Sequence, residues 1–353
     1  MKFYKQKKYD RNRIAPSSID NIFEMHRNIS ENVLSKKRFN DFLSYLKISD
    51  LDKYPNIDPL ISKIAAKHNV KNKNLMVTSG IDGGLKSVFE MCSCPGDKIA
   101  TYYPTYAMYK VYSEIFDLKM IDIKFNLNLK VTLDDLVKVM DEDISILFLP
   151  NPNMPIEFSF NFDEIDKIVG IAQKKEILVV VDEAYALFGS DTSIPLISKY
   201  DNLLIARTFS KAIGLPGIRL GYMLGQGKLI SYLQTRRFAH ESNALSVAAG
   251  MWALDNDNKF EKIKDKVVST RDWFKSELLD LGISCYGSET NTVILNLKNR
   301  ADANNLSSVL KQHGFLIKNN YPEGYNNFVS ITIGEHKLMI KLLYAIKNHL
   351  FTN

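Results

Sequence analysis

Short apolar runs alternate with segments of helix length between residues 58 and 240, and this alternation restricts the possible fold more than any other feature. Runs such as Ile177–Val181 and Leu203–Arg207 are apolar almost throughout, which is typical of strands covered on both faces. Strands that alternate with helices predict a mainly parallel α/β sheet. The seven expected strands are Leu75–Thr78, Lys98–Tyr102, Lys119–Ile123, Ser145–Leu149, Ile177–Val181, Leu203–Arg207 and Leu220–Leu224.

Helical segments separate these strands, and two of them begin with a recognisable cap. Thr132 stands three residues before Asp135, and Asn161 stands three residues before Glu164. A polar side chain followed by carboxylates in the first turn is typical of a helix start. The expected helices of this region include Gly83–Met91, Thr132–Met140 and Asp163–Lys174.

The pattern changes after about residue 245, where long helical segments lead into two short strands. The expected elements are helices Ser246–Leu254, Phe260–Leu281, Ala303–His313 and His336–Leu350, with strands Thr292–Leu297 and Phe328–Ile333. A chain of 353 residues is long enough for two domains. We expect a large α/β domain over residues 46–242, and a smaller α+β domain formed by residues 243–353 with the N-terminal arm, residues 1–45.

Composition excludes several classes of protein. Hydrophobic residues make up 45% of the chain and charged residues 24%, which suits a sizeable core and not a disordered chain. No apolar run approaches the roughly 20 residues of a membrane span, and no apolar stretch follows the basic N-terminal segment as in a secretory signal. The net charge of +6 is mild, and no basic motif interleaved with aromatic residues is present, so we expect neither a nucleic-acid nor a membrane partner.

The cysteines indicate neither a disulfide framework nor a metal site. Cys92, Cys94 and Cys285 are too few for a framework, and the first two lack the spacing of a redox or zinc pair. We expect reduced thiols, a cytoplasmic location and no bound metal.

The most informative motif is Arg207-Thr-Phe-Ser-Lys211-Ala-Ile-Gly-Leu-Pro-Gly-Ile-Arg219, which begins in a predicted strand. A single lysine at a strand–helix turn is ordinarily a solvated surface residue, but here hydroxyls precede it and glycines and an arginine follow. A lysine in a desolvated cleft can lose its proton and form an imine with an aldehyde. Thr208 and Ser210 can donate hydrogen bonds to a phosphate, and Arg219 can neutralise it.

Two further motifs lie at the ends of predicted strands. Asp182 ends a buried strand where α/β sheets bind ligands, so it can hold a positive ring nitrogen, with Tyr185 in reach of a phenolate oxygen. Its alternative role is a helix cap. The segment Thr78-Ser-Gly80-Ile-Asp82-Gly-Gly opens a helix whose N–H groups can bind phosphate. It is not the GxGxxG fingerprint, and residues 221–228 do not form a Walker motif, which argues against a nucleotide-dependent dehydrogenase.

Taken in this order, these residues resemble fold-type I pyridoxal-phosphate (PLP) enzymes of the class I/II aminotransferase superfamily, above all the histidinol-phosphate aminotransferases. The resemblance extends from about Tyr54 to the C-terminus. It implies a mainly parallel seven-stranded sheet in a large α/β domain, a smaller α+β domain and PLP as cofactor. The motifs that carry it are Tyr54-Pro-Asn, Gly80-Ile-Asp82, Pro104-Thr-Tyr106-Ala-Met-Tyr109, Pro150-Asn-Pro-Asn153, Asp182-Glu-Ala-Tyr185, Thr208-Phe-Ser-Lys211 and Gly217-Ile-Arg219.

The resemblance also implies a role for each matching residue. Lys211 would form the imine with the cofactor aldehyde and act as base and acid in the proton shift, while Asp182 would pair with the pyridinium nitrogen. Tyr185 would hydrogen-bond to the ring's phenolate oxygen, and Tyr106 would stack on the ring. Tyr54 would reach the phosphate bound by a neighbouring subunit, so a homodimer with shared active sites is expected. The residues implied for the cofactor phosphate are Gly80, Ile81, Asp82, Thr208, Ser210 and Arg219.

Two positions depart from the family pattern. Where the family reads Asn-Pro-Thr-Gly, this chain has Met154-Pro-Ile-Glu157, so the asparagine donor to the ring oxygen is missing unless Asn153 takes its place. Where the family has an arginine for the substrate's α-carboxylate, this chain has Ser330. The remaining candidates for binding the substrate, each of which can equally be a solvated surface group, are Arg27, Arg236, Arg237, His240 and Lys318, together with Ser330 itself.

Three functions remain open at this point. The leading one is a PLP-dependent aminotransferase that moves an amino group between an amino donor and a small polar carbonyl substrate, with or without a phosphate. A PLP-dependent decarboxylase of an amino acid or phospho-amino acid is the alternative, because the bond broken at Cα depends on an angle that the sequence does not reveal. The third is a non-catalytic relative of the fold, which Met154 and Ser330 favour.

Overall fold

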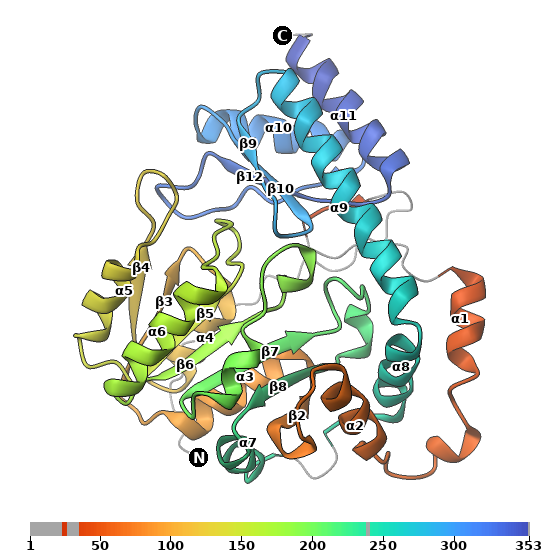
Figure 1. Ribbon diagram of the computed structural model, residues 1–353. Coiled ribbons are helices and arrows are strands. Elements are labelled where there is room, and N and C mark those ends of the chain that lie inside the picture. Colours follow the sequence, from red (N-terminus) through yellow and green to blue (C-terminus); the bar gives the residue numbers. More distant parts are fainter. Residues whose placement is uncertain (1–22, 27–34, 238–240, 352–353) are drawn as a thin grey trace, which may run out of the picture.

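A seven-stranded sheet forms the base of the molecule, and a smaller sheet formed by the C-terminal part of the chain lies above it (Figure 1). The structure is a computed structural model that describes residues 23–26, 35–237 and 241–351. The strands of the large sheet are β2 (Leu75–Thr78), β3 (Lys98–Tyr103), β4 (Lys119–Lys124), β5 (Ile146–Pro150), β6 (Leu178–Asp182), β7 (Leu203–Thr208) and β8 (Gly221–Gly225).

The large sheet is mainly parallel, which confirms the prediction. Its order is β2-β8-β7-β6-β5-β3-β4, and the five strands from β7 to β4 run parallel. Strand β8 is antiparallel to both β7 and β2. Residues 209–220, between β7 and β8, hold only a 3₁₀ turn, η5 (Pro216–Ile218), and no crossover helix, so the chain returns beside β7 in the opposite direction.

The central strands are apolar for most of their length because each of their faces packs on a separate core. In β6, Val179 and Val181 belong to one buried cluster and Val180 to the other. Successive side chains of a strand point to opposite faces, so a continuous apolar run fills both cores. The helices and 3₁₀ turns of this unit are α2 (Asp58–Lys67), α3 (Gly80–Cys92), α4 (Ala107–Ile115), α5 (Leu133–Met140), α6 (Phe162–Lys174), α7 (Gly227–Gln234), η1 (Ile48–Asp50), η2 (Asn72–Asn74), η3 (Ala186–Phe188) and η4 (Ile194–Ser198).

The predicted helix starts at Thr132 and Asn161 are both capping boxes. The Thr132 hydroxyl accepts from the backbone of Asp135, and the Asn161 side chain accepts from the backbone of Glu164, with each carboxylate bonded back to the cap residue. Each box satisfies backbone N–H groups that a helix end would otherwise leave without a partner.

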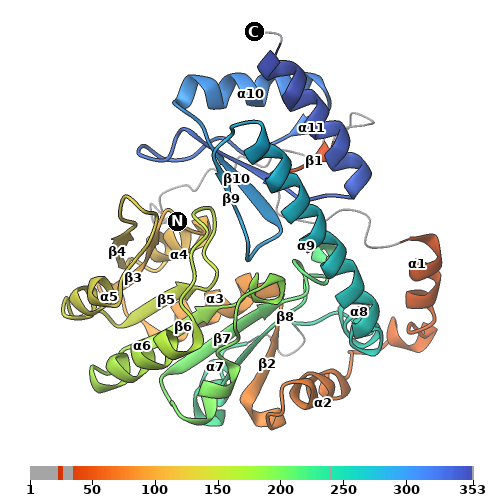
Figure 2. The same ribbon diagram turned by 45° about the horizontal axis from the view of Figure 1, so that its top comes forward.

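The smaller unit contains a three-stranded antiparallel sheet with β10 at its centre, and α9 runs from beside the large sheet up to it (Figure 2). Its described elements are α8 (Ala244–Asp255), α9 (Asp257–Asp280), β9 (Cys285–Tyr286), β10 (Thr292–Asn296), α10 (Arg300–Gln312), β11 (Phe315–Leu316), β12 (Phe328–Thr332) and α11 (His336–Phe351). The N-terminal segment contributes β1 (Phe23–Glu24), which pairs with β11, and α1 (Lys36–Leu43), which packs against α8. The domain boundaries at residues 45 and 242 stay a prediction.

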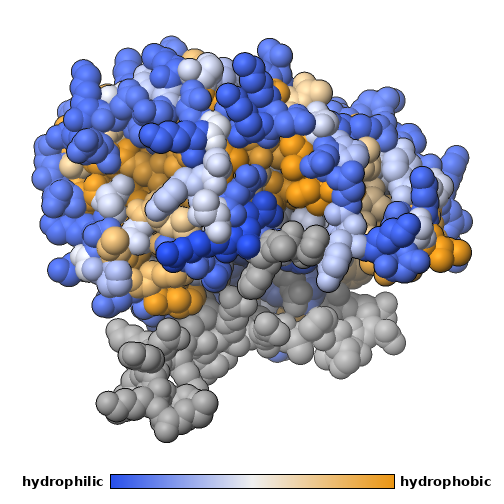
Figure 3. All heavy atoms as spheres, turned by 90° about the horizontal axis from the view of Figure 1, so that it is seen from below, coloured by the Kyte–Doolittle hydropathy of each residue, from blue (hydrophilic) through white to orange (hydrophobic). Residues whose placement is uncertain are grey.

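The surface of the large unit is mixed in character. In the coloured part of the face in Figure 3, hydrophilic side chains surround apolar patches. Within the described residues, no helix has the length and apolar character needed to cross a membrane.

Candidate active site

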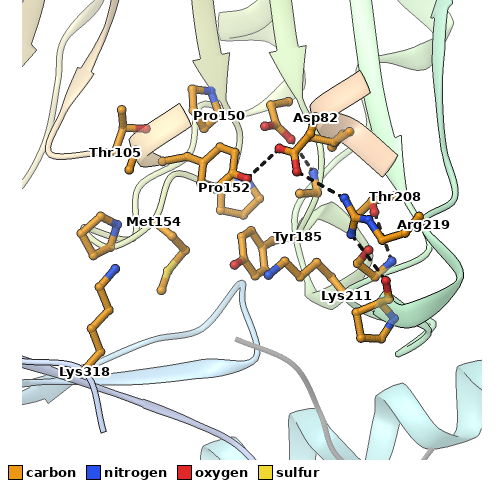
Figure 4. A pocket seen from close by; sticks show the side chains of 18 of the residues that line it. Asp82, Thr105, Pro150, Pro152, Met154, Tyr185, Thr208, Lys211, Arg219 and Lys318 are labelled. Atoms are coloured by element: carbon orange, nitrogen blue, oxygen red, sulfur yellow. Dashed lines mark hydrogen bonds and ion pairs between the residues drawn. The ribbon is translucent and has the colours of Figure 1, made fainter. Parts of the chain in front are cut away.

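A cavity of about 360 Å³ lies at the carboxyl ends of β5, β6 and β7, where parallel α/β sheets bind their ligands (Figure 4). The last residues of these strands, Pro150, Asp182 and Thr208, all line it. The smaller unit closes it from the opposite side with Lys318 and Tyr321. The other lining residues are Ile81, Asp82, Thr105, Tyr106, Ala107, Pro152, Met154, Pro155, Ala184, Tyr185, Ser210, Lys211, Pro216 and Arg219.

Asp182 is a buried carboxylate at the floor of the cavity. The Tyr109 hydroxyl donates to its Oδ2 at 2.8 Å, and the Ala184 backbone N–H donates to its Oδ1 at 3.0 Å. Burial nevertheless raises the pKa of Asp182 to about 6. A positive ligand atom beside this carboxylate would therefore stabilise its ionised form.

Tyr109 is a site residue to which the sequence analysis gave no role. It follows Tyr106, the N-cap residue of α4, by three residues, and the centroids of the two rings are 6.1 Å apart. This three-residue spacing is the feature of the sequence that could have indicated Tyr109 as a site residue. The partner itself, Asp182, is 73 residues away in sequence, and only the strand order brings it close.

Lys211 enters the cavity from the connection after β7. Its Nζ lies 5.1 Å from the centre of the Tyr185 ring, and Figure 4 shows the two side chains side by side. The predicted catalytic set of Lys211, Asp182 and Tyr185 thus meets in one cavity.

Arg219 and Gly80 form a tight corner beside Lys211. Gly80 has φ +67°, and a Cβ at that position would lie 2.8 Å from Nη2 of Arg219. A side chain at position 80 would therefore displace the guanidinium. The backbone of Ile81 is also approached closely, since a Cβ on Gly221 would lie 2.9 Å from its nitrogen. The corner combines a helix N-terminus, the start of α3, with a cation.

Thr208, Ser210, Asp82 and Tyr106 complete this end of the cavity. The Thr208 hydroxyl accepts from the Ser210 N–H at 3.1 Å. Asp82 pairs with Arg219 at 3.3 Å and accepts from the Tyr106 hydroxyl at 2.7 Å. Asp82, Thr208, Ser210 and Arg219, four of the predicted phosphate ligands, therefore line the same cavity.

Asn153 is a predicted cofactor residue that does not line the cavity. Its amide donates to the carbonyls of Pro104 (3.2 Å) and Ile156 (2.7 Å), and its oxygen accepts from the Thr105 hydroxyl. These bonds use the whole buried amide to hold a turn. Met154 lines the cavity instead, so Asn153 does not replace the missing asparagine donor.

Of the substrate-binding candidates that fall within the described residues, Lys318 is the one that lines the cavity. Burial lowers the pKa of Lys318, and the positive charge of Lys211 lowers it further. Its Nζ lies 5.1 Å from the ring of Tyr321, whose hydroxyl bonds to the Ser330 hydroxyl. Ser330 is buried behind Tyr321 and is not a lining residue.

The other candidates lie elsewhere. Arg236 is exposed just after α7, and Arg237 is paired with Glu241 at 2.8 Å. Arg27 and His240 lie outside the described residues. Tyr54 is 75% exposed, in a separate hollow. In the described ranges, no three His, Cys, Asp or Glu side chains gather as metal ligands.

Comparison with known proteins decides the family. A sequence profile described as aminotransferase class I and II matches residues 24–346. The chain belongs to this family. Enzymes of this family use PLP, so the chain is a PLP-dependent aminotransferase, with an amino donor and a carbonyl acceptor as substrates.

Individual relatives agree with this family. The aminotransferase is 35% identical over 304 residues to a histidinol-phosphate aminotransferase from Brachyspira hyodysenteriae, covering 83% of each chain. Its fold is similar to the histidinol-phosphate aminotransferase of Sinorhizobium meliloti in complex with pyridoxal-5'-phosphate, with a TM-score of 0.85, 21% identity and coverage of 93% and 90%. It is also similar in fold to the L-threonine-O-3-phosphate decarboxylase of Porphyromonas gingivalis, with a TM-score of 0.76, 19% identity and coverage of 94% and 100%.

The cavity of this aminotransferase fits PLP at both ends. The buried Asp182 carboxylate suits a protonated ring nitrogen, because burial raises its pKa and a positive ligand atom beside it would favour its ionised form. At the other end, the corner at Gly80, which a Cβ would fill, suits a phosphate beside Arg219. The Lys211 amine enters the same cavity.

Proposed function

We propose that this aminotransferase works in the cavity at the ends of β5, β6 and β7, and that its substrate carries a phosphate. The observation that carries this proposal is that Asp182, Lys211 and Arg219 line one cavity, although Asp182 lies 29 residues before Lys211 in sequence. Asp82, which pairs with Arg219 at the same cavity, lies 137 residues before it. A phosphate on the substrate is supported by the names of two relatives, which are histidinol-phosphate aminotransferases.

In this proposal, different residues of the cavity contact different parts of the cofactor. When bound, PLP supplies an electron-accepting ring that stabilises negative charge on the substrate carbon. The Asp182 carboxylate holds a proton on the ring nitrogen, and Tyr185 donates a hydrogen bond to the ring oxygen. With Met154 in the place of a donor, Tyr185 is the main partner of that oxygen.

Proton transfer falls to Lys211. Its Nζ removes the proton from the substrate carbon that bears nitrogen and delivers a proton one position along, as the general base and acid of the reaction. Tyr106 covers the ring. The phosphate is bound by the backbone at Gly80 and Ile81, the hydroxyls of Thr208 and Ser210, and the Arg219 guanidinium, while the Asp82 carboxylate orients that guanidinium.

Lys318 binds the anionic group of the substrate. Lys211 and Arg219 are committed to chemistry and cofactor, so among the lining residues Lys318 is the cation that remains for the substrate. A buried ammonium gains strongly from an anionic partner, because burial alone disfavours its charge. Tyr321 borders the same space, and its bond to Ser330 orients its hydroxyl.

Replacing Lys318 with methionine tests this role. We expect KM for the anionic substrate to rise by about 10–100-fold, because a charge-assisted contact in a desolvated site is lost. Cofactor affinity should change less than about twofold. Arg236→Met is the matched control, since that cation is exposed outside the cavity. Steady-state kinetics check this, and an equal effect of both variants would contradict the role of Lys318.

A homodimer is also part of the proposal. Leu51, Tyr54 and Leu245 are 74%, 75% and 49% exposed, and all three line one hollow. Gly217 and Ile218, directly before Arg219, line it as well. Large exposed apolar side chains gathered at one place mark an interaction surface. A second copy placed there would bring its Tyr54 towards the Arg219 corner.

Light scattering tests the dimer. We expect a mass of twice 40.3 kDa, or 80.6 kDa. Leu51→Lys should shift the mass towards the monomer and lower activity, because it buries a charge in the interface. Leu127→Lys is the control, since that leucine is fully exposed elsewhere. A wild-type monomer with full activity would contradict shared active sites.

Transamination is distinguished from decarboxylation by products. The fold does not separate them, because a decarboxylase shares it. Incubation with an amino donor should convert bound cofactor to its amino form, and a phosphorylated carbonyl acceptor should reverse the change. Release of carbon dioxide without that conversion would contradict the proposal. A cytoplasmic location, which the three unpaired cysteines suit, is likewise proposed.

A further inference from the structure

Glu157 joins the two sides of the molecule next to the cavity. It lies in the connection between β5 and α6, and its carboxylate reaches residues 288–290 of the smaller unit, just before β10. Oε1 accepts from the Ser288 backbone N–H at 2.5 Å, the Ser288 hydroxyl at 3.2 Å and the Glu289 N–H at 3.2 Å. Oε2 accepts from the Thr290 hydroxyl at 2.7 Å. Both oxygens are therefore committed to one short segment.

Two further contacts between the large and the smaller unit lie beside the Glu157 carboxylate. The Ser159 hydroxyl donates to the Glu289 carboxylate, again from the β5–α6 connection to the smaller unit. A Cβ on Gly189 would lie 3.2 Å from the carbonyl oxygen of Ser288, so the large unit lies directly against this segment. The segment Ser288–Thr290 is thus held from more than one side.

On the large-unit side, Glu157 is fixed to the wall of the cavity. Met154 and Pro155, three and two residues before it, line the cavity. The Asn153 backbone N–H donates to the Phe158 carbonyl at 2.8 Å, and the Asn153 amide holds the Ile156 carbonyl. Glu157 therefore stands on a tightly bonded turn and moves with that wall.

On the side of the smaller unit, strand β10 and its hydrogen bonds connect Thr290 to Lys318, which lines the cavity. Thr290 is buried, and its carbonyl accepts from Arg271 at 2.8 Å. It leads into β10, where Ile294 pairs with Ser330 of β12. Ser330 exchanges two backbone hydrogen bonds with Lys318, at 3.2 and 2.8 Å. Figure 4 shows the Lys318 side chain reaching from the smaller unit towards Met154.

We infer that Glu157 is a positioning residue for amino transfer, whose carboxylate sets the spacing between the wall at Met154 and the wall at Lys318. The inference rests on the proposed function in one respect, namely that the substrate lies between these walls. Four donors converge on one carboxylate, and charge-assisted hydrogen bonds of this kind are the stronger ones. Removing the carboxylate leaves two backbone N–H groups without that partner, so the distance between the two walls is no longer fixed.

The test compares Glu157→Ala and Glu157→Gln with Glu164→Ala in the full-length, PLP-loaded enzyme. Glu164 is the matched control, because its described hydrogen bonds stay within the cap of α6. We expect kcat/KM to fall about tenfold in Glu157→Ala, mainly through KM, because a small displacement of a binding wall misplaces the substrate. Glu157→Gln keeps an acceptor oxygen and should lose about threefold or less. The cofactor absorption spectrum and the Glu164→Ala kinetics should stay unchanged.

Amide hydrogen exchange provides a readout that needs no substrate. The backbone amides of Lys318 and Ser330 should exchange faster in Glu157→Ala than in wild type, and not in Glu164→Ala. Because this measurement does not depend on which substrate is used, it tests the inference even if the proposed phosphorylated substrate is wrong. Unchanged exchange at both amides, or a kcat/KM within twofold of wild type, would overturn it.

Discussion

Replacing Lys211 with alanine lowers the rate of amino transfer by at least about 1,000-fold, and this is the largest effect that we expect from a single substitution. The reason is that one amine has two tasks in the proposed site: it binds the cofactor aldehyde and moves the substrate proton. Tyr185, the aromatic ring at 5.1 Å, has no basic group that could take over the second task. Steady-state product formation at saturating cofactor measures the effect.

Lys174→Ala provides the control for this prediction. Lys174 ends α6 as an exposed residue, so its removal deletes a lysine without touching the cavity. We expect its rate to stay within about twofold of wild type. A Lys211→Ala enzyme with more than a tenth of the wild-type rate would mean that another group carries the proton.

Asp182→Asn has the second largest effect, a loss of about 100-fold or more in kcat. The neutral amide cannot hold a proton on the ring nitrogen, so the ring withdraws fewer electrons from the substrate carbon. The side chain keeps nearly the same shape, so part of the cofactor should still bind. Asp191→Asn, which changes an exposed aspartate, is the control. A wild-type kcat in Asp182→Asn would remove the proposed role of this carboxylate.

The same substitution should change the pH dependence of stability in the cofactor-free protein. The pKa of Asp182 is raised by burial to about 6, above its unfolded value near 3.8, so its contribution to folding is greatest below pH 4 and declines as the pH rises through 6. Asparagine does not titrate. Urea unfolding should therefore show the free energy of unfolding of the variant, relative to wild type, increasing between pH 4 and pH 8 by up to about 3 kcal/mol. A constant difference would contradict a carboxylate whose pKa is raised by burial.

The large sheet could be predicted because its strands carry their own signal. All seven expected strands match the observed ones to within one residue at each end, as for Leu203–Arg207 against β7. Helices such as α4 and α7 were not predicted. The direction of β8 was not predictable either, because it depends on how residues 209–220 turn back rather than on the apolar pattern of Leu220–Leu224.

The site was predictable where a motif is continuous and not where a contact spans the chain. The lysine motif indicated Lys211 and Arg219 together, since both follow one strand. The Tyr109–Asp182 bond and the Glu157–Thr290 bond join residues 73 and 133 positions apart, which no local spacing reveals. Asn153 was expected at the cofactor because of its neighbours in sequence, whereas its amide is bonded within a buried turn and does not line the cavity.

The most direct test of the account is to find which lysine carries the cofactor. Lys211 and Lys318 both line the cavity, so Lys318 is the alternative lysine that could carry the cofactor. The enzyme loaded with PLP is reduced with borohydride, digested and mapped by mass spectrometry. We predict the pyridoxyl group on the peptide that contains Lys211 and not on the peptide that contains Lys318. Label on Lys318, or an unlabelled Lys211, would contradict the central claim.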